Sequence, residues 1–82
     1  MAAFNLGLML QNRGDADGAK TFYRVALASG HRTEAPKAAV NLGLLLERAG
    51  DAPGAEAAYR EGVAYGEPDA VVLLEELRQG RG

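Results

Sequence analysis

Apolar residues along the chain recur at the spacing of amphipathic helices, in five segments that glycines separate. Between residues 15 and 30 they follow one another three or four positions apart, which places them on one face of a helix. Segments 2–12 and 34–48 are apolar almost all round, so their helices must be covered on more than one side. The pattern predicts helices over residues 2–12, 15–30, 34–48, 52–65 and 69–79.

The ends of these segments carry residues that stop and start helices. Gly14 and Gly50 can take the left-handed conformation that closes a helix. Asp15 and Asp51 follow directly, and a short carboxylate there can accept hydrogen bonds from the free N–H groups of the next turn. We expect Thr33 to cap the third helix in the same way.

The first two helices are repeated by the next two. Residues 1–30 and 37–66 are identical at sixteen equivalent positions, 36 residues apart. A period of this length is typical of a solenoid, in which each unit buries its apolar face against its neighbour. The predicted fold is therefore all-α, a helical repeat (α-solenoid) of two helix-turn-helix hairpins plus a C-terminal closing helix. Within a single domain over residues 1–82, we place repeat 1 at 1–35, repeat 2 at 36–68 and the closing helix at 69–80.

The closing helix is expected to cover the open side of the second hairpin, as terminal caps do in solenoids. Its apolar residues are consecutive over much of its length. We expect Val71, Leu74 and Leu77 to face inward, with Val72 and Leu73 beside them.

Gly7 and Gly43 lie in the middle of predicted helices, where glycine costs about 1 kcal/mol relative to alanine. Because the cost occurs twice at equivalent positions, we expect the second helix of each hairpin to pack against the backbone there. A Cβ would hold that helix away. Tyr23 and Tyr59 occupy equivalent positions on the second helices, and packing is their expected role.

These residues resemble the tetratricopeptide repeat, whose pattern places Leu-Gly on the first helix and Ala-x-x-x-aromatic on the second. Ala3 and Leu10 stand where that family often has Trp and Tyr. The Ala-x-x-x-Gly spacing of residues 26–30 is also similar to the Sel1-like branch, and the choice between the two stays open. The matching residues are Leu6, Gly7, Ala19 and Tyr23 in the first unit, and Leu42, Gly43, Ala55 and Tyr59 in the second.

The resemblance implies a scaffold that binds a peptide or protein segment on the concave surface formed by the first helix of each hairpin. Phe4 and Leu8, four residues apart, are expected to point together away from the hairpin partner. Asn5 and Asn41 are either ordinary surface residues or ligand contacts, since an amide can both donate to and accept from an extended backbone. The residues that the resemblance places on this surface are Phe4, Asn5, Leu8, Gln11 and Asn12 in the first unit, and Lys37, Val40, Asn41, Leu44, Glu47 and Arg48 in the second.

Two functions fit this surface. Its apolar residues favour binding of an apolar segment or helix. They do not favour the terminal carboxylate that one variant of the family binds. Alternatively, the same apolar surface buries against a second copy of the chain, giving a homo-oligomer without a separate ligand.

Chemistry that would indicate an enzyme is not apparent in the sequence. There are no cysteines, which excludes disulfides, thiolate nucleophiles and cysteine zinc sites. The segment around Lys20 resembles a phosphate-binding loop, but alanine precedes the lysine and the second unit has Glu56 there. Ser29 and His31 fall in a predicted link, without a dry pocket or an evident third group to orient the base. We expect no catalysis, metal or cofactor.

The net charge limits the classes of partner that the chain can bind. The chain carries a formal charge of −2, with five basic and three acidic residues before position 42 and four basic and eight acidic residues after it. Neither half is basic enough for a nucleic-acid surface. No apolar run approaches the roughly 20 residues that cross a bilayer. We therefore expect a cytoplasmic protein that contacts neither nucleic acid nor membrane.

Overall fold

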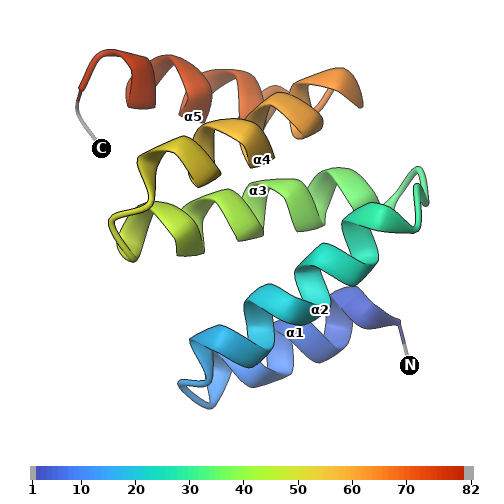
Figure 1. Ribbon diagram of the computed structural model, residues 1–82. Helices are drawn as coiled ribbons and strands as arrows, with labels where there is room; N and C mark the ends of the chain where they lie inside the picture. Colours follow the sequence, from blue (N-terminus) through green and yellow to red (C-terminus); the bar gives the residue numbers. More distant parts are fainter. Residues whose placement is uncertain (1, 81–82) are drawn as a thin grey trace.

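The computed structural model describes residues 2–80, which form five helices and, within that range, no strand (Figure 1). The helices begin and end within about two residues of the predicted bounds. They are α1 (Ala3–Asn12), α2 (Ala16–Ala28), α3 (Glu34–Arg48), α4 (Ala52–Ala64) and α5 (Pro68–Arg78).

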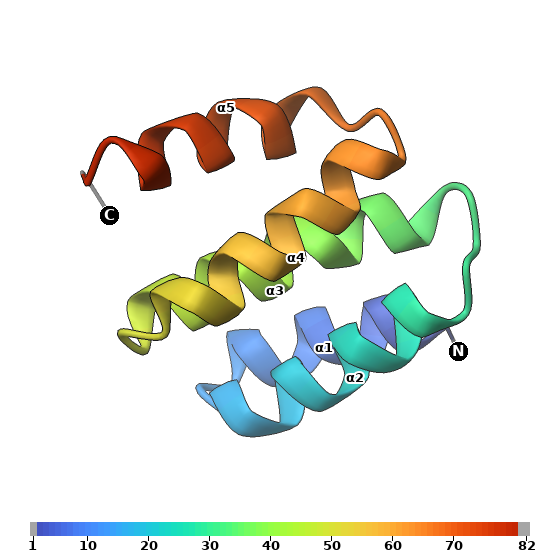
Figure 2. The same ribbon diagram turned by 45° about the horizontal axis from the view of Figure 1, so that its top comes forward.

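Each helix packs against the next one along the chain, which builds a stack of two hairpins closed by α5. Figure 2 shows the α1–α2 hairpin, the α3–α4 hairpin and α5 as successive layers. The described chain measures 36 × 26 × 15 Å, so the stack is thin in one direction. Because α3 contacts all four other helices, the core centres on it and eight of its residues are buried.

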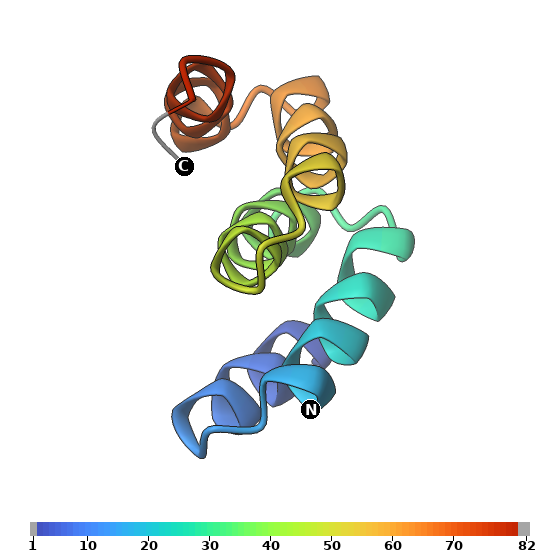
Figure 3. The ribbon, with the colours of Figure 1, turned by 60° about the vertical axis from the view of Figure 1, so that its left-hand side comes forward.

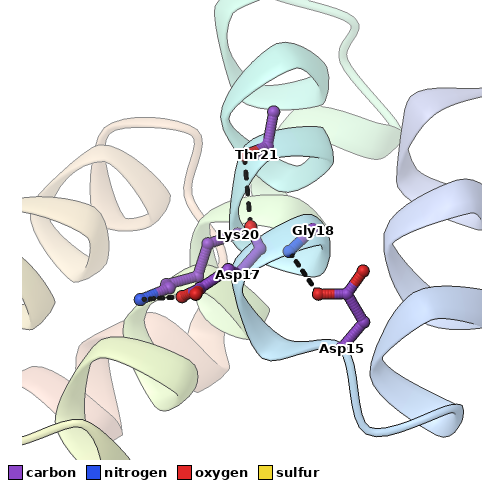
Figure 4. A network of polar contacts seen from close by, with 5 residues as sticks. All are labelled: Asp15, Asp17, Gly18, Lys20 and Thr21. Carbon is purple, nitrogen blue, oxygen red and sulfur yellow. Dashed lines mark hydrogen bonds and ion pairs between the residues drawn. The ribbon is translucent and has the colours of Figure 1, made fainter.

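The turn inside each hairpin is built from the predicted pair of glycine and aspartate. Gly14 and Gly50 have φ values of +85° and +82°, in the left-handed region. The Asp15 carboxylate then accepts a hydrogen bond of 2.9 Å from the backbone N–H of Gly18, the cap that Figure 4 shows, and Asp51 repeats the bond with Gly54. Both predicted caps are therefore confirmed.

Thr33 does not cap α3 as predicted. It precedes the helix, but its side chain makes no capping hydrogen bond and its backbone is already helical (φ −86°, ψ −44°). The helical turn begins earlier, because the carbonyl of His31 accepts a 2.8 Å hydrogen bond from the N–H of Ala35. A capping side chain requires a non-helical backbone at its own position, which Thr33 lacks.

The inward face of α5 is as predicted at Leu74 and Leu77 but not at Val71. Ala70 and Leu74 are buried, and Leu77 and Leu73 pack partly against the core, whereas Val71 is 45% exposed. Ala70 faces inward because α4 comes very close there: a Cβ on Gly62 would lie 2.7 Å from the Cβ of Ala70. Only a small side chain fits this contact, so the buried stripe begins at Ala70 instead of Val71.

The mid-helix glycines are explained by two buried tyrosines. Tyr23 and Tyr59 are 0% exposed, and their rings lie directly against the glycines of the preceding helices. A Cβ on Gly7 would lie 2.5 Å from Cε1 of Tyr23, and one on Gly43 would overlap the Tyr59 ring at least as severely. The predicted close approach is confirmed, with the tyrosine rings as the atoms that make it.

Candidate functional site

The first helices of the two hairpins form a common side of the molecule. Turned to show the stack from its edge, Figure 3 has α1, α3 and α5 along one side and α2 and α4 along the other. Direct contacts join α1 to α3 and α3 to α5. We call the outward stripe of α1 and α3 the A-helix face and define it by the eleven predicted residues.

Every residue of the A-helix face reaches the surface, to different degrees. Four of them, all polar, are exposed, and the apolar ones are all half-buried. The stripe is therefore polar outside and partly apolar inside. Exposed are Asn5, Asn12, Lys37 and Arg48; half-buried are Phe4, Leu8, Gln11, Val40, Asn41, Leu44 and Glu47.

Phe4 and Leu8 do not point away from the hairpin as predicted. Both pack partly against the core, and the Phe4 ring centre lies 5.8 Å from that of Tyr23 at an interplanar angle of 39°. Tilted aromatic pairs at this separation attract each other. Phe4 therefore packs beside the Tyr23 ring, and both side chains stay partly exposed.

The Tyr23 hydroxyl interacts with polar side chains of both hairpins. It donates a 2.6 Å hydrogen bond to Oε1 of Gln11 on α1. Burial raises the pKa of Tyr23 above its usual value, and a hydrogen bond with the Asn41 side chain on α3 partly offsets the rise. Gln11 and Asn41 are thus brought together by a tyrosine from α2.

The second hairpin repeats this arrangement with a charge in it. The Tyr59 hydroxyl donates a 2.8 Å hydrogen bond to Oε1 of Glu47. Burial, the hydrogen bond to Glu47 and the negative charges of Glu47 and Glu76 together raise the pKa of Tyr59 far above its usual value, against a smaller opposite effect of Arg48. The phenol therefore stays protonated and continues to donate.

Sequence reasoning missed this use of the tyrosine hydroxyls. A signal was present, because a residue with a side-chain carbonyl or carboxylate oxygen precedes the tyrosine by twelve positions in both units, as Gln11 and as Glu47. The packing role alone did not require a partner for the hydroxyl. A buried hydroxyl nevertheless needs one, since an unpaired polar group is costly inside a protein.

Ser29 and His31 hold the link between the hairpins. The Ser29 hydroxyl donates to the carbonyl of Ala26 at 2.6 Å and accepts from the N–H of His31 at 3.2 Å. Nδ1 of His31 lies 3.4 Å from the backbone nitrogen of Thr33, which donates to it. Their polar atoms are thus used in shaping an exposed link.

Residues 2–80 contain no group of three or more His, Asp or Glu side chains placed to hold a metal ion. Over the same range, no helix has both the length and the apolarity that a membrane span requires.

Stacked helix hairpins with a shared inner side define the α-solenoid class of repeat protein. Within this class, residues 3–34, which include α1 and α2, match the family model of the tetratricopeptide repeat. The first hairpin is a tetratricopeptide repeat, and the second carries the same Leu-Gly and Ala-x-x-x-Tyr residues with the same ring-on-glycine contact. The resemblance to the Sel1-like branch is not supported by this match and stays a prediction.

Comparison of the chain with curated proteins and with solved structures gave no match. The family is therefore the available guide to function. Tetratricopeptide repeats are generally non-catalytic scaffolds that bind proteins or peptides.

Proposed function

We propose that the chain binds a peptide or protein segment along the A-helix face. The observation that carries the proposal is the half-exposed apolar middle of that face, formed by Leu8, Val40 and Leu44 on two packed hairpins. Apolar side chains left partly in contact with water gain free energy when a partner covers them, by about 25 cal/mol for each Å².

The two asparagines of the face are not equivalent. Asn5 is exposed, whereas Asn41 is half-buried and already hydrogen-bonds Tyr23. Asn5 is therefore the better candidate to pair with the backbone of a bound segment. Asn41 acts at least in part between the hairpins, where it supports the shape of the face.

Self-association through the same apolar middle would use the same residues. The two functions differ in solution mass: a monomer without ligand supports segment binding, and a stable dimer supports self-association. Light scattering coupled to size-exclusion chromatography measures this directly, at concentrations above and below the micromolar range.

The test of segment binding uses peptides selected on the wild-type chain from a random displayed library. Leu44→Glu places a charge in the apolar middle and is expected to weaken the selected peptides at least about tenfold, because truncated or disrupted central contacts cost 2 kcal/mol or more. The matched control is Val25→Glu, since Val25 is 52% exposed on α2, a second helix that lies on the opposite side of the stack.

The proposal is wrong if both variants keep their helical circular dichroism and bind the peptides equally well. It is also wrong if Leu44→Glu unfolds the chain, because Leu44 would then belong to the core. A dimeric wild-type chain that becomes monomeric on Leu44→Glu would establish the alternative, self-association.

A further inference from the structure

Two pockets lie at the turn ends of the hairpins, one against each following helix. The first is a depression of about 320 Å³ where the α1–α2 turn meets α3, and its polar lining comes from Gln11, Lys20 and Arg48. The second, about 300 Å³, lies where the α3–α4 turn meets α5, and Glu47 and Leu77 line it.

The two pockets are copies of each other in the repeat. Gln11, Gly14 and Ala16 line the first, and the residues 36 positions later, Glu47, Gly50 and Ala52, line the second. An apolar wall comes in each case from the next helix along the stack, as Leu45 of α3 and Leu77 of α5. The pocket is thus a regular product of stacking a helix on a hairpin turn.

Their charges are opposite. Of the described residues, two cations, Lys20 and Arg48, and no carboxylate line the first pocket. Lys20 pairs with Asp17 at 3.3 Å (Figure 4), but the Asp17 side chain is 95% exposed, and such surface pairs stabilise little. Among residues 2–80, the one charged residue that lines the second pocket is Glu47.

In each pocket a buried tyrosine holds the polar residue at the same repeat position. Tyr23 donates to Oε1 of Gln11, and Tyr59 donates to Oε1 of Glu47. The group left for a ligand is then the NH₂ of Gln11 in one pocket and Oε2 of Glu47 in the other. Fixing these side chains before binding lowers the entropy that a ligand would have to offset.

The chemistry of the linings identifies what each pocket accepts. The first offers donors and positive charge beside Leu45, which suits the carboxylate of an aspartate or glutamate. The second offers a carboxylate beside the apolar Leu77, which suits a lysine or arginine with its charged end on Glu47 and its stem on the leucine.

We propose that these pockets read one acidic and one basic side chain of the same bound segment, the acidic one at the first hairpin and the basic one at the second. This inference rests on the proposed binding of a segment along the A-helix face, to which Gln11, Glu47 and Arg48 also belong. Charge complementarity then fixes the direction in which the segment lies.

The fold limits the distance between the two side chains. Neighbouring packed helices are about 8–10 Å apart, so hairpins separated by two such steps place equivalent points at most about 20 Å apart. An extended chain rises about 3.3 Å per residue, so the acidic and basic residues lie no more than about six positions apart.

The test begins with selection from a random displayed peptide library on the wild-type chain. The expected result is enrichment of peptides that carry Asp or Glu and Lys or Arg in one constant order, within about six positions. Each selected peptide is then resynthesised with glutamine for the acidic residue or with norleucine for the basic one, and both changes should weaken binding about tenfold or more.

Protein variants assign each charge to its pocket. Glu47→Gln keeps an acceptor for Tyr59, as Gln11 already does for Tyr23, and should remove the preference for the basic residue alone. Lys20→Gln combined with Arg48→Gln should remove the preference for the acidic residue alone. Matched controls are Arg24→Gln and Glu61→Gln, whose side chains line neither of the two pockets.

The outcomes separate this inference from the function on which it rests. Peptides selected without the charged pair, or whose neutral forms bind equally well, overturn the inference and leave binding on the A-helix face in place. A library that yields no peptide above background on the wild-type chain overturns both.

Discussion

Replacing Gly43 by alanine tests the tightest packing contact of the fold. A Cβ there would lie 2.5 Å from Cδ1 and 2.9 Å from Cζ of Tyr59, whereas ordinary contacts begin at 3.4 Å. Cε1 of the ring would lie closer still, so the ring must move by more than about 0.9 Å, the difference between 3.4 and 2.5 Å. Such a shift also disturbs the 2.8 Å hydrogen bond from Tyr59 to Glu47.

The size of the effect follows from three contributions. Overpacking costs about 1–3 kcal/mol, and a hydrogen bond to a charged acceptor is worth about 1.5–3 kcal/mol. The better helix propensity of alanine offsets about 1 kcal/mol of this loss in stability. We expect a net loss of about 1.5–5 kcal/mol in the free energy of unfolding, which lowers the melting temperature of a chain of this size by at least about 6 °C.

Thermal and urea unfolding followed by circular dichroism measure this loss. Gly7→Ala should cost less, because its Cβ would lie 2.6 Å from Cδ1 and 3.2 Å from Cζ of Tyr23, whose acceptor Gln11 is neutral. In a Tyr59→Leu background the Gly43 substitution should cost much less, since the ring is gone. An unchanged cost in that background, or melting within about two degrees of the parent, would refute the role of the ring.

Three further substitutions probe the turn, the cap helix and the buried hydroxyl. Asp51→Ala should lower the free energy of unfolding by about 1 kcal/mol in urea titrations, because it removes the α4 cap. Leu74→Ala should cost about 2–4 kcal/mol, against under about 0.5 kcal/mol for the exposed Val72→Ala in the same thermal melts. Tyr59→Phe loses the bond to Glu47 and should cost about 1.5–3 kcal/mol at neutral pH. Because the folded pKa of Tyr59 is raised above 10.0, the unfolded chain releases that proton first, so wild-type stability should fall more than that of Tyr59→Phe between about pH 9 and pH 11.

The parts of the fold that could be predicted depend on local chemistry. Gly14 and Asp15 define a turn through the φ angle that one allows and the N–H groups that the other accepts, and neither effect needs a distant partner. Gly7 was informative for another reason. Its cost inside a helix has to be offset by a close neighbour, and Tyr23 is that neighbour.

The start of the inward face of α5 could not be predicted, because residues 70–74 are five consecutive apolar positions. Any of several stripes through Val71, Val72 and Leu73 is hydrophobic enough to be buried. The choice is made by α4, where the absence of a side chain at Gly62 lets the Cβ of Ala70 come close. Helix phase is thus set by the shape of the partner when hydrophobicity does not distinguish the faces.

The same limit applies to the candidate site. The resemblance placed Asn41 and Gln11 on one surface, but their common contact with the Tyr23 hydroxyl depends on how α2 is positioned between α1 and α3. The turn-end pockets also depend on how the units stack, since Leu45 and Arg48 of the first pocket come from a helix of the next unit. Sequence periodicity identifies the units, and the stacking between units creates the site.

Residues that are identical in the two units serve the fold, and residues that differ serve the site. Identical residues such as Gly7 and Gly43, with the tyrosines that cover them, make the contacts inside each hairpin. The residues that change charge, Gln11 to Glu47, keep the same hydrogen bond to the tyrosine while altering what the pocket presents. Because the acceptor atom is preserved, ligand chemistry can change between units with little effect on the fold. Selectivity in this chain should therefore reside in the residues that its repeats do not share.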